Sequence, residues 1–237
     1  MASAPAHDAL IEIAPTVSRA RAVVRHPGLT EEVYETILAR LTALEIAPGA
    51  RITVDGLARE LNVSQTPIRE ALGRLEGEGL VVKTHLIGYS AAPAMTRHRF
   101  EELFELRLML EPTIAARAAA RVTADNLSSL RAMFDLMSKR RRGDSRLRYS
   151  AFARQDAIFH DRIAEIAGNE LVRRTHFHQH THFHIFRLVE HSDVTEAALE
   201  EHGVLLAALA SGDSEAAGQA MRIHIERSRD RLFSTME

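Results

Sequence analysis

Apolar positions along the chain follow two patterns, and the pattern changes once, near Ala92. Before that point, helical spacing is interrupted by two short β-prone runs; after it, only the helical period of about 3.6 residues recurs. The pattern therefore predicts a small mixed unit at residues 29–92 and an all-helical unit at residues 93–237. Residues 1–28 are small and polar and show no such period, which is typical of an extension.

The segment from Val54 to Leu80 has the spacing of two short helices joined by a tight turn. Apolar residues recur along one side of each helix: Leu57, Ala58, Leu61, Ile68, Ala71, Leu72 and Leu75. Ser64 stands where its side-chain oxygen can cap the second helix, and Pro67 falls in the first turn, where a missing N–H costs nothing. Two helices with such a turn form a helix-turn-helix, whose second helix enters the DNA major groove.

Two β-prone runs follow this helix pair, at Leu80–Lys83 and Leu86–Ala91, with Thr84-His85 as the turn between them. They predict a hairpin, and a hairpin directly after a helix-turn-helix is the wing of a winged helix. An amphipathic helix at Val33–Leu44 precedes the pair. The expected fold class is therefore mainly α: an N-terminal winged helix-turn-helix followed by a C-terminal all-α helical bundle.

Polar side chains on the outward, N-terminal side of the second helix are candidates for DNA contact. They are long enough to reach bases or phosphates, and the core does not need them. Gln65 can pair with adenine through two hydrogen bonds, and Gly88 lets the wing approach the DNA backbone. The residues that we expect to bind DNA are Ser64, Gln65, Thr66, Arg69, Arg74 and Gly88.

The charge balance limits this interpretation. The chain has a formal net charge of −2, and in residues 29–92 the carboxylates outnumber the Lys and Arg side chains, whereas a DNA-binding domain is usually basic. Positive surface must therefore be local, at Arg69, Arg74 and Lys83. Residues 1–28 are either a loosely docked extension or an arm whose arginines add phosphate contacts. We expect binding to need two subunits and to weaken steeply with salt.

Along this segment the chain resembles the GntR transcription regulators. The resemblance rests on the stretches IAPGARI, LARELNVSQTPIREAL and LEGEGLV, and it covers residues from about Leu29 to Ala92. It implies a transcription regulator that binds its operator through the winged helix. Many members of the family have Arg at the position of Gln65, so the base preference of the family is not carried over there.

Helical spacing continues through the second unit in about six segments separated by turn residues. They are Phe100–Ala120, Asp125–Met137, Tyr149–Ala167, Leu171–Glu190, Val194–Ala210 and a last helix that ends near Leu232. The charged turn at residues 139–144 is interpreted as a solvated loop rather than a DNA-binding patch. Helices of this number and length predict a compact all-α domain with one core.

Three of these helices place a metal-competent side chain on their apolar side. Asp156 and His160 lie one turn apart on the third helix. His202 falls on the apolar stripe of the fifth helix, and His224 falls on that of the last. Imidazole and carboxylate together suit zinc, nickel, manganese or iron. Taken singly, each histidine is more often a satisfied core residue than a metal ligand, and Asp156 and His160 can simply hydrogen-bond each other; the four together favour a metal site.

The helical half resembles the FCD domain, which is the effector-binding domain of the FadR subfamily of GntR regulators. The matching stretches are FELRLMLEPTIAARAA, DAIFHDRIAEIAGN, EHGVLLAALASGDSEAA and MRIHI. In the metal-binding members, the ligands are an Asp and a His in a D-x3-H pattern and two later histidines. The resemblance therefore implies a divalent metal, zinc or nickel first and manganese or iron second, held by Asp156, His160, His202 and His224, with open positions for a carboxylate effector.

The resemblance also implies two further effector contacts. An Arg on the first helix of the domain often helps to hold the effector, and Arg107 fits that role; an ion pair with Glu111 is the alternative. The family helix that corresponds to the histidine run HFHQHTHFH borders the effector cavity, so we expect His180 to face the ligand. The other histidines of the run are expected at the surface or in packing, with a second metal site as a hypothesis.

Composition narrows the class of protein. The chain has no cysteine, which excludes disulfides and thiolate metal sites. No apolar run approaches the ~18 residues that span a bilayer, and the N-terminus lacks the pattern of a secretory signal. We therefore expect a soluble, cytoplasmic protein. The two resemblances imply a homodimer that binds a palindromic operator as a repressor controlled by a small carboxylic acid. The alternatives are a metal-dependent enzyme acting on a small carboxylate and a DNA-binding scaffold with a structural metal.

Overall fold

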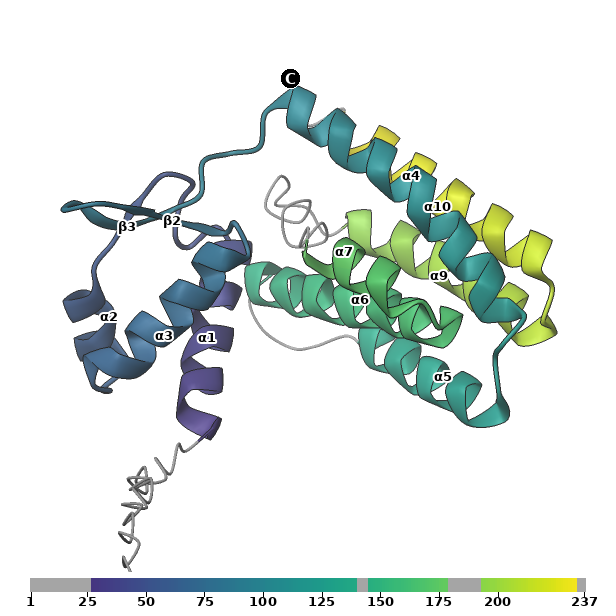
Figure 1. The fold of residues 1–237 in the computed structure, drawn as a ribbon, viewed down its shortest axis with the longest axis horizontal. Coiled ribbons are helices and arrows are strands. Elements are labelled where there is room, and N and C mark those ends of the chain that lie inside the picture. The colour runs from purple at the N-terminus through teal and green to yellow at the C-terminus, as the bar shows by residue number, and fades with distance from the viewer. Residues whose placement is uncertain (1–26, 140–144, 179–192, 234–237) are drawn as a thin grey trace, which may run out of the picture.

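The computed structural model describes residues 27–139, 145–178 and 193–233 of the chain. They form two units, here called the winged-helix unit (residues 27–92) and the helical unit (residues 97–233), which are joined by a short segment without helix or strand (Figure 1). The predicted fold class is confirmed, because the first unit combines a small sheet with helices and the second is entirely helical in the part that is described.

The winged-helix unit contains three helices and a three-stranded antiparallel sheet of order β1-β3-β2. Its elements are α1 Pro27–Thr42, β1 Arg51–Ile52, α2 Val54–Glu60, α3 Gln65–Gly77, β2 Val81–Thr84 and β3 Gly88–Ala91. The helix pair and the hairpin fall where the sequence predicted them. Strand β1 was not predicted, since two residues are too few to show alternation; Arg51 pairs with Ser90 and Ile52 with Tyr89.

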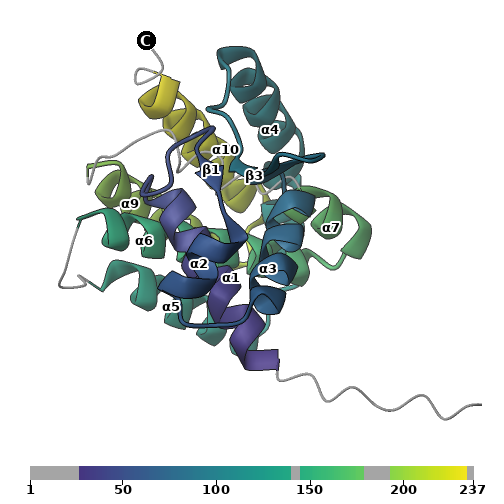
Figure 2. The same cartoon turned by 90° about the vertical axis from the view of Figure 1, so that its left-hand side faces the viewer.

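The core of the winged-helix unit lies between α1 and α3. The two helices lie against each other (Figure 2). The apolar side chains of their shared core are fully buried: Ile37, Leu41, Ile68, Ala71, Leu72 and Leu75. Burial of a side chain of this size contributes about 1.5–3 kcal/mol. The packing of α1 against α3 therefore fixes how α3 is presented to solvent.

Two local predictions were wrong in detail. Ser64 is the N-cap residue of α3, but its side chain makes no capping hydrogen bond; the tight turn depends instead on Asn62, whose φ is +53°. The turn of the wing is longer than Thr84-His85, because β3 begins at Gly88. Within that turn, the Ile87 N–H donates to the Thr84 carbonyl at 3.1 Å.

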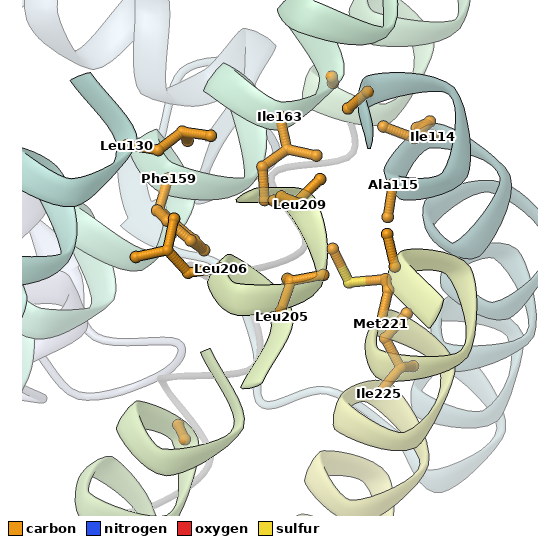
Figure 3. Packing of buried hydrophobic residues seen from close by; sticks show 14 of the residues in the cluster. Ile114, Ala115, Leu130, Phe159, Ile163, Leu205, Leu206, Leu209, Met221 and Ile225 are labelled. Atoms are coloured by element: carbon orange, nitrogen blue, oxygen red, sulfur yellow. The ribbon is translucent and has the colours of Figure 1, made fainter. Parts of the chain in front are cut away.

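The helical unit packs its helices around one apolar core (Figure 3). The helices are α4 Arg97–Ala119, α5 Ala124–Ser138, α6 Ser145–Ala167, α7 Glu170–His178, α9 Asp193–Ser211 and α10 Ser214–Phe233. The first two begin at threonine caps, since Thr96 accepts from the Arg99 N–H and Thr123 from the Asn126 N–H, each at 3.2 Å. The predicted helix from Leu171 matches α7 as far as His178, and its remainder lies outside the described residues.

The buried side of helix α4 only partly follows its leucines: Leu103 is buried. Leu106 and Leu110 are only half-buried, whereas Arg107 and Glu111 are each 2% exposed. Helices α10, α6 and α9 cover this buried side. An ion pair therefore occupies core positions of α4, which binary patterning assigns to apolar residues.

The two units meet where α1 lies against the N-terminal half of α6 (Figure 1). Ala157 of α6 packs against the apolar core of the winged-helix unit. Beside it, Arg154 Nη2 lies 2.6 Å from Glu35 Oε1 of α1. The junction thus combines an apolar contact with an ion pair. None of the described helices has both the length and the apolar character of a membrane span.

Leu86 at the tip of the wing is predicted to lower the stability of the winged-helix unit. Its φ is +63° and its side chain is 94% exposed, so it adopts a left-handed conformation without gaining packing. Asn tolerates that conformation better. Leu86→Asn is expected to raise the free energy of unfolding by about 1 kcal/mol, as measured by chemical denaturation.

Ile87→Asn is the matched control, because Ile87 is also exposed but has a negative φ. It should leave the free energy of unfolding nearly unchanged. Equal effects of the two substitutions would show that the backbone conformation of Leu86 carries no cost.

Candidate metal centre and nucleic-acid interface

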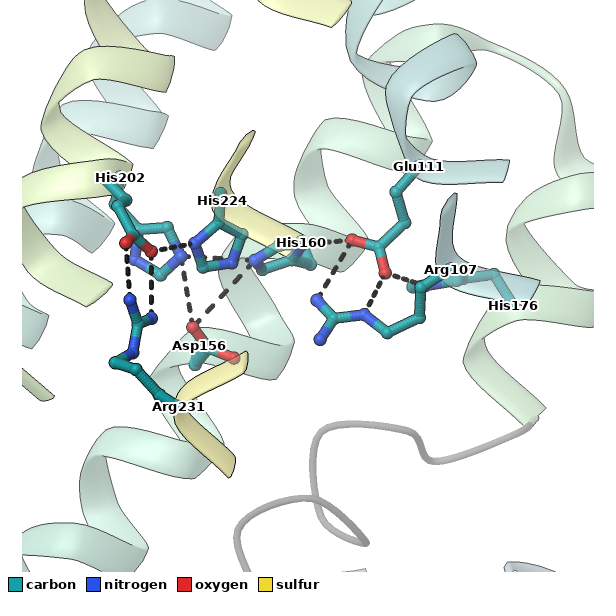
Figure 4. A network of polar contacts seen from close by, with 9 residues as sticks. Arg107, Glu111, Asp156, His160, His176, His202, His224 and Arg231 are labelled. Carbon is teal, nitrogen blue, oxygen red and sulfur yellow. Dashed lines mark hydrogen bonds and ion pairs between the residues drawn. The ribbon is translucent and has the colours of Figure 1, made fainter. Parts of the chain in front are cut away.

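Three histidines from three helices converge inside the helical unit (Figure 4). His160 comes from α6, His202 from α9 and His224 from α10, and all three are buried, with exposed fractions of 3% or less. One ring nitrogen of each lies within 4.8 Å of one ring nitrogen of the other two. The periodicity argument that placed these residues on apolar sides is therefore confirmed, and the cluster can hold a metal ion.

The distances within the cluster agree with a shared ion. Two nitrogens on one tetrahedral zinc ion lie about 3.3 Å apart, as follows from Zn–N bonds of about 2.0–2.1 Å. His160 Nε2 and His202 Nε2 are 3.2 Å apart. Asp156 Oδ1 lies 3.3 Å from His202 Nε2 and 3.9 Å from His160 Nε2. Asp156, the predicted fourth ligand, thus lies beside the Nε2 atoms of His202 and His160.

Glu111 fixes the orientation and tautomer of His160. Its Oε2 lies 2.7 Å from His160 Nδ1. Burial opposes its ionisation, yet the charge of Arg107 and the nearby imidazoles of His176 and His160 hold the pKa of Glu111 well below its usual value. An ionised carboxylate only accepts hydrogen bonds, so Nδ1 must donate; in the neutral form of the imidazole, its one N–H is then on Nδ1 and the lone pair is on Nε2. The arrangement leaves Nε2 as the atom that can bind a metal.

Glu201 performs the same task for His224. Its Oε2 accepts from His224 Nδ1 at 2.9 Å, and its two oxygens accept from Arg231 at 2.6 and 3.0 Å. Burial opposes ionisation of Glu201, but these two partners hold its pKa below the usual value. Burial also lowers the pKa of His224. The imidazole is therefore neutral near pH 7, which is the form that binds metals.

Glu111, Glu201, Arg231 and His176 belong to the site, although sequence reasoning did not place them there. His176 Nε2 of α7 lies 3.0 Å from Glu111 Oε1 and is buried. Glu111 was considered only as a partner of Arg107. Periodicity gave no signal for Glu201, because its neighbour His202 already occupied the apolar stripe. A histidine that binds a metal through one ring nitrogen usually donates a hydrogen bond from the other. This chemistry is the one signal in the sequence that could have suggested a search for such carboxylates.

The two residues expected to bind an effector have different outcomes. Arg107 Nε donates to Glu111 Oε1 at 2.6 Å inside the core, which is the ion pair that the sequence left open as an alternative. A direct role of Arg107 in effector binding stays a prediction. His180 lies outside the described residues.

The predicted DNA-contacting residues lie on the winged-helix unit as expected, at exposed positions. Gln65 Nε2 donates to Asp55 Oδ1 at 2.5 Å, and Arg69 Nη2 donates to Gln65 Oε1 at 3.1 Å. These side chains share the N-terminal end of α3 with Thr66 and Ser64, which are also exposed. Their contacts with DNA stay predictions.

Arg74 and Gly88 lie in other surroundings. Arg74 is near the other end of α3, where it pairs with Glu31 at 2.8 Å and Glu78 at 3.3 Å and covers the ring of Tyr34. These contacts stabilise the packing of α1 on α3. Gly88 is exposed and has a φ of +106°, a conformation that favours glycine.

The sequence matches two family profiles that together cover most of the described chain. The profile described as "Bacterial regulatory proteins, gntR family" matches residues 29–88. The profile described as "FCD domain" matches residues 102–227. The first corresponds to the winged-helix unit and the second to the helical unit that contains the histidine cluster.

Curated relatives are transcription regulators. The chain is 34% identical over 128 residues to the Nta operon transcriptional regulator of Aminobacter aminovorans, a match that covers 54% of this chain and only 59% of that protein. It is 27% identical over 217 residues to the HTH-type transcriptional regulator LutR of Bacillus subtilis, covering 81% of this chain and 96% of that protein.

Solved structures agree on the fold. E. coli McbR/YncC superimposes with a TM-score of 0.70 at 19% identity, over 88% of this chain and 99% of that one. A transcriptional regulator GntR from Rhodococcus sp. RHA1 superimposes with a TM-score of 0.66 at 20% identity, over 86% and 97% of the two chains. At these identities the likeness concerns the fold alone.

Glu201 is predicted to control metal affinity through His224. Glu201→Gln keeps the size of the side chain but replaces the ionised acceptor that holds Nδ1–H. We expect the dissociation constant for zinc to rise by about 10- to 100-fold, as measured by competition with a chromophoric chelator.

Glu200→Gln is the matched control, since Glu200 is an exposed neighbour on the same helix. It should leave zinc affinity unchanged. Equal affinity of the wild-type chain and Glu201→Gln would mean that Glu201 does not act on a metal site.

Proposed function

The chain belongs to the GntR family of bacterial transcription regulators that carry an FCD domain, and on this premise we propose that it is a homodimeric repressor whose operator affinity is set by a small carboxylic acid bound beside a metal ion. DNA binding and transcription regulation follow from the family. The ligand set, the effector class and the dimer are the proposal. The enzyme alternative is set aside, because this is a family of regulators.

The observation that carries the proposal is the buried cluster of His160, His202 and His224 with Asp156 at its border. Burying so many polar groups is costly unless they bind something or one another. Glu111 and Glu201 orient two of the imidazoles so that Nε2 of each is available. Zinc or nickel suits this mixture of imidazole and carboxylate, and when bound it would supply the positive charge that attracts a carboxylate oxygen of the effector.

On the DNA side, we propose that the exposed N-terminal end of α3 enters the major groove. Arg69 and Thr66 would bind phosphates or bases, Gln65 would read a base, and Gly88 would let the wing approach the backbone. A homodimer presents two such helices related by a two-fold axis, so the operator is expected to be a palindrome. The two winged-helix units of the dimer can adopt different relative placements. An effector that binds one placement more tightly than the other changes operator affinity by linkage.

Removal of one ligand tests the metal and effector parts of the proposal. His202→Ala should lower bound zinc from about one ion per chain to near zero and abolish the response of operator affinity to a panel of small carboxylic acids. His98→Ala is the control, because His98 is exposed on α4. Undiminished zinc content and response in His202→Ala would contradict the assignment.

Selection of bound duplexes from a random pool tests the DNA part. We expect the wild-type chain to enrich a palindrome. Arg69→Ala should weaken binding to all sequences and reduce the slope of log affinity against log salt by about 1 per lost phosphate contact. Gln65→Ala should relax the preference at one position by about 1–3 kcal/mol.

Arg131→Ala serves as the control for these substitutions, because Arg131 is exposed on α5, away from the winged-helix unit. It should change neither the slope nor the selected sequence. A pool from which no sequence is enriched, at any salt concentration, would exclude specific operator binding.

A further inference from the structure

Helix α6 is shared between the histidine cluster and the winged-helix unit. On one side it contributes Asp156 and His160 to the cluster. On another side it contributes Arg154 and Ala157 to the junction with α1. Asp156 and Ala157 are consecutive residues, so a candidate metal ligand and a contact of the DNA-binding unit lie on the same helical turn.

The contacts at the junction are specific in geometry but modest in strength. Arg154 Nη2 lies 2.6 Å from Glu35 Oε1, with side-chain exposures of 47% and 23%. Ala157 packs against the core that contains α1 and α3. Burial raises the pKa of Glu35, and the charge of Arg154 opposes that rise. Exposed ion pairs stabilise a fold only weakly, so this one is better suited to setting the orientation of α1 on α6 than to preventing a change in it.

A rigid helix transmits a shift of one residue to the next, because its backbone hydrogen bonds fix the rise and rotation between them. A rotation of α6 that brings Asp156 nearer to the histidines therefore also moves Ala157 and Arg154 against α1. Since α1 packs directly on α3, the DNA-contacting helix follows α1. Between units in one chain, a small and partly polar junction permits such relative motion.

Resting on the function proposed above, we propose that α6 couples the histidine cluster to DNA binding, with Arg154 and Ala157 as the positioning residues. Binding of a metal at Asp156 and the histidines sets the orientation of α6. The Arg154–Glu35 pair and the Ala157 contact pass that orientation to α1, and so to the spacing of the two α3 helices in a dimer. Neither positioning residue touches DNA or metal in this scheme.

The test uses the full-length protein, a duplex recovered by selection, and zinc alone as the probe. Operator affinity is measured with zinc and with a chelator, and the ratio of the two dissociation constants is the zinc response. For the wild-type chain we expect a response of about fivefold or more, the lower end of typical coupling. Arg154→Glu and Glu35→Arg should each reduce the response towards 1, because each places like charges together at the junction.

The double variant E35R/R154E restores an ion pair with its charges exchanged. It should recover at least half of the logarithm of the wild-type zinc response. If the single variants lost the response only because they were less stable, combining them would not restore it. Arg131→Glu is the matched charge reversal on α5 and should keep the full response. All variants should still bind the same number of zinc ions per chain as the wild-type chain, because the ligands are intact.

A second readout does not depend on DNA. The chain has no cysteine, so Glu76→Cys on α3 and Leu171→Cys on α7, both exposed, allow clean spin labelling. Zinc should shift the distance distribution between the two labels in the otherwise wild-type chain. The same shift should be absent when Arg154→Glu is added.

Several outcomes would overturn the coupling. The coupling would be contradicted if zinc changed neither the operator affinity nor the label distance of the wild-type chain. It would also be contradicted if the single charge reversals kept the full zinc response, or if the double variant had a response no larger than that of either single variant. The proposed function fails separately, through absence of an enriched operator or of a carboxylic-acid response. A protein that selects an operator and responds to an acid, but whose response survives Arg154→Glu, would keep its function and lose α6 as the link.

Discussion

The helical unit depends on two buried carboxylates that must stay ionised. Glu111 and Glu201 each accept from the Nδ1 of one histidine and are each compensated by one arginine. An ionised carboxylate without such partners would be too costly in the core. The carboxylates therefore tie helices together: Glu111 of α4 contacts α6 and α7, and Glu201 joins α9 to α10. The geometry of the histidine cluster follows from these contacts.

The winged-helix unit resolves the conflict between its acidic composition and DNA binding by pairing charges away from the N-terminal end of α3. Arg74 is held by Glu31 and Glu78, and Arg40 lies 2.8 Å from Glu60. Three carboxylates of this unit, Glu31, Glu60 and Glu78, are thus paired within the fold. The N-terminus of α3 itself carries partial positive charge from its backbone N–H groups, and Arg69 stands beside it. The local electrostatic field, rather than the net charge of the unit, decides where a DNA phosphate can approach its surface.

The sequence was sufficient to predict an element and its buried side where that side is uniformly apolar. Helical spacing located α3 and placed His202 and His224 on buried sides, because each falls on a stripe of leucine or alanine. It failed where polar groups are buried in pairs: Glu111 and Arg107 occupy core positions of α4, and a pattern of single residues cannot show that each compensates the other. Strand β1 was missed for a different reason, since its partner β3 lies far along the chain and only the tertiary fold defines it.

The three histidines stand at positions 160, 202 and 224, on three different helices. An ion held by all three would act as a crosslink that closes two loops, and it would stabilise the folded chain by a free energy that grows with the logarithm of the free-metal concentration. Chains without the ion would open more often and be degraded sooner by proteases. The cellular amount of such a regulator would then follow the supply of its metal, so that starvation for the metal changes gene expression even when the effector is absent.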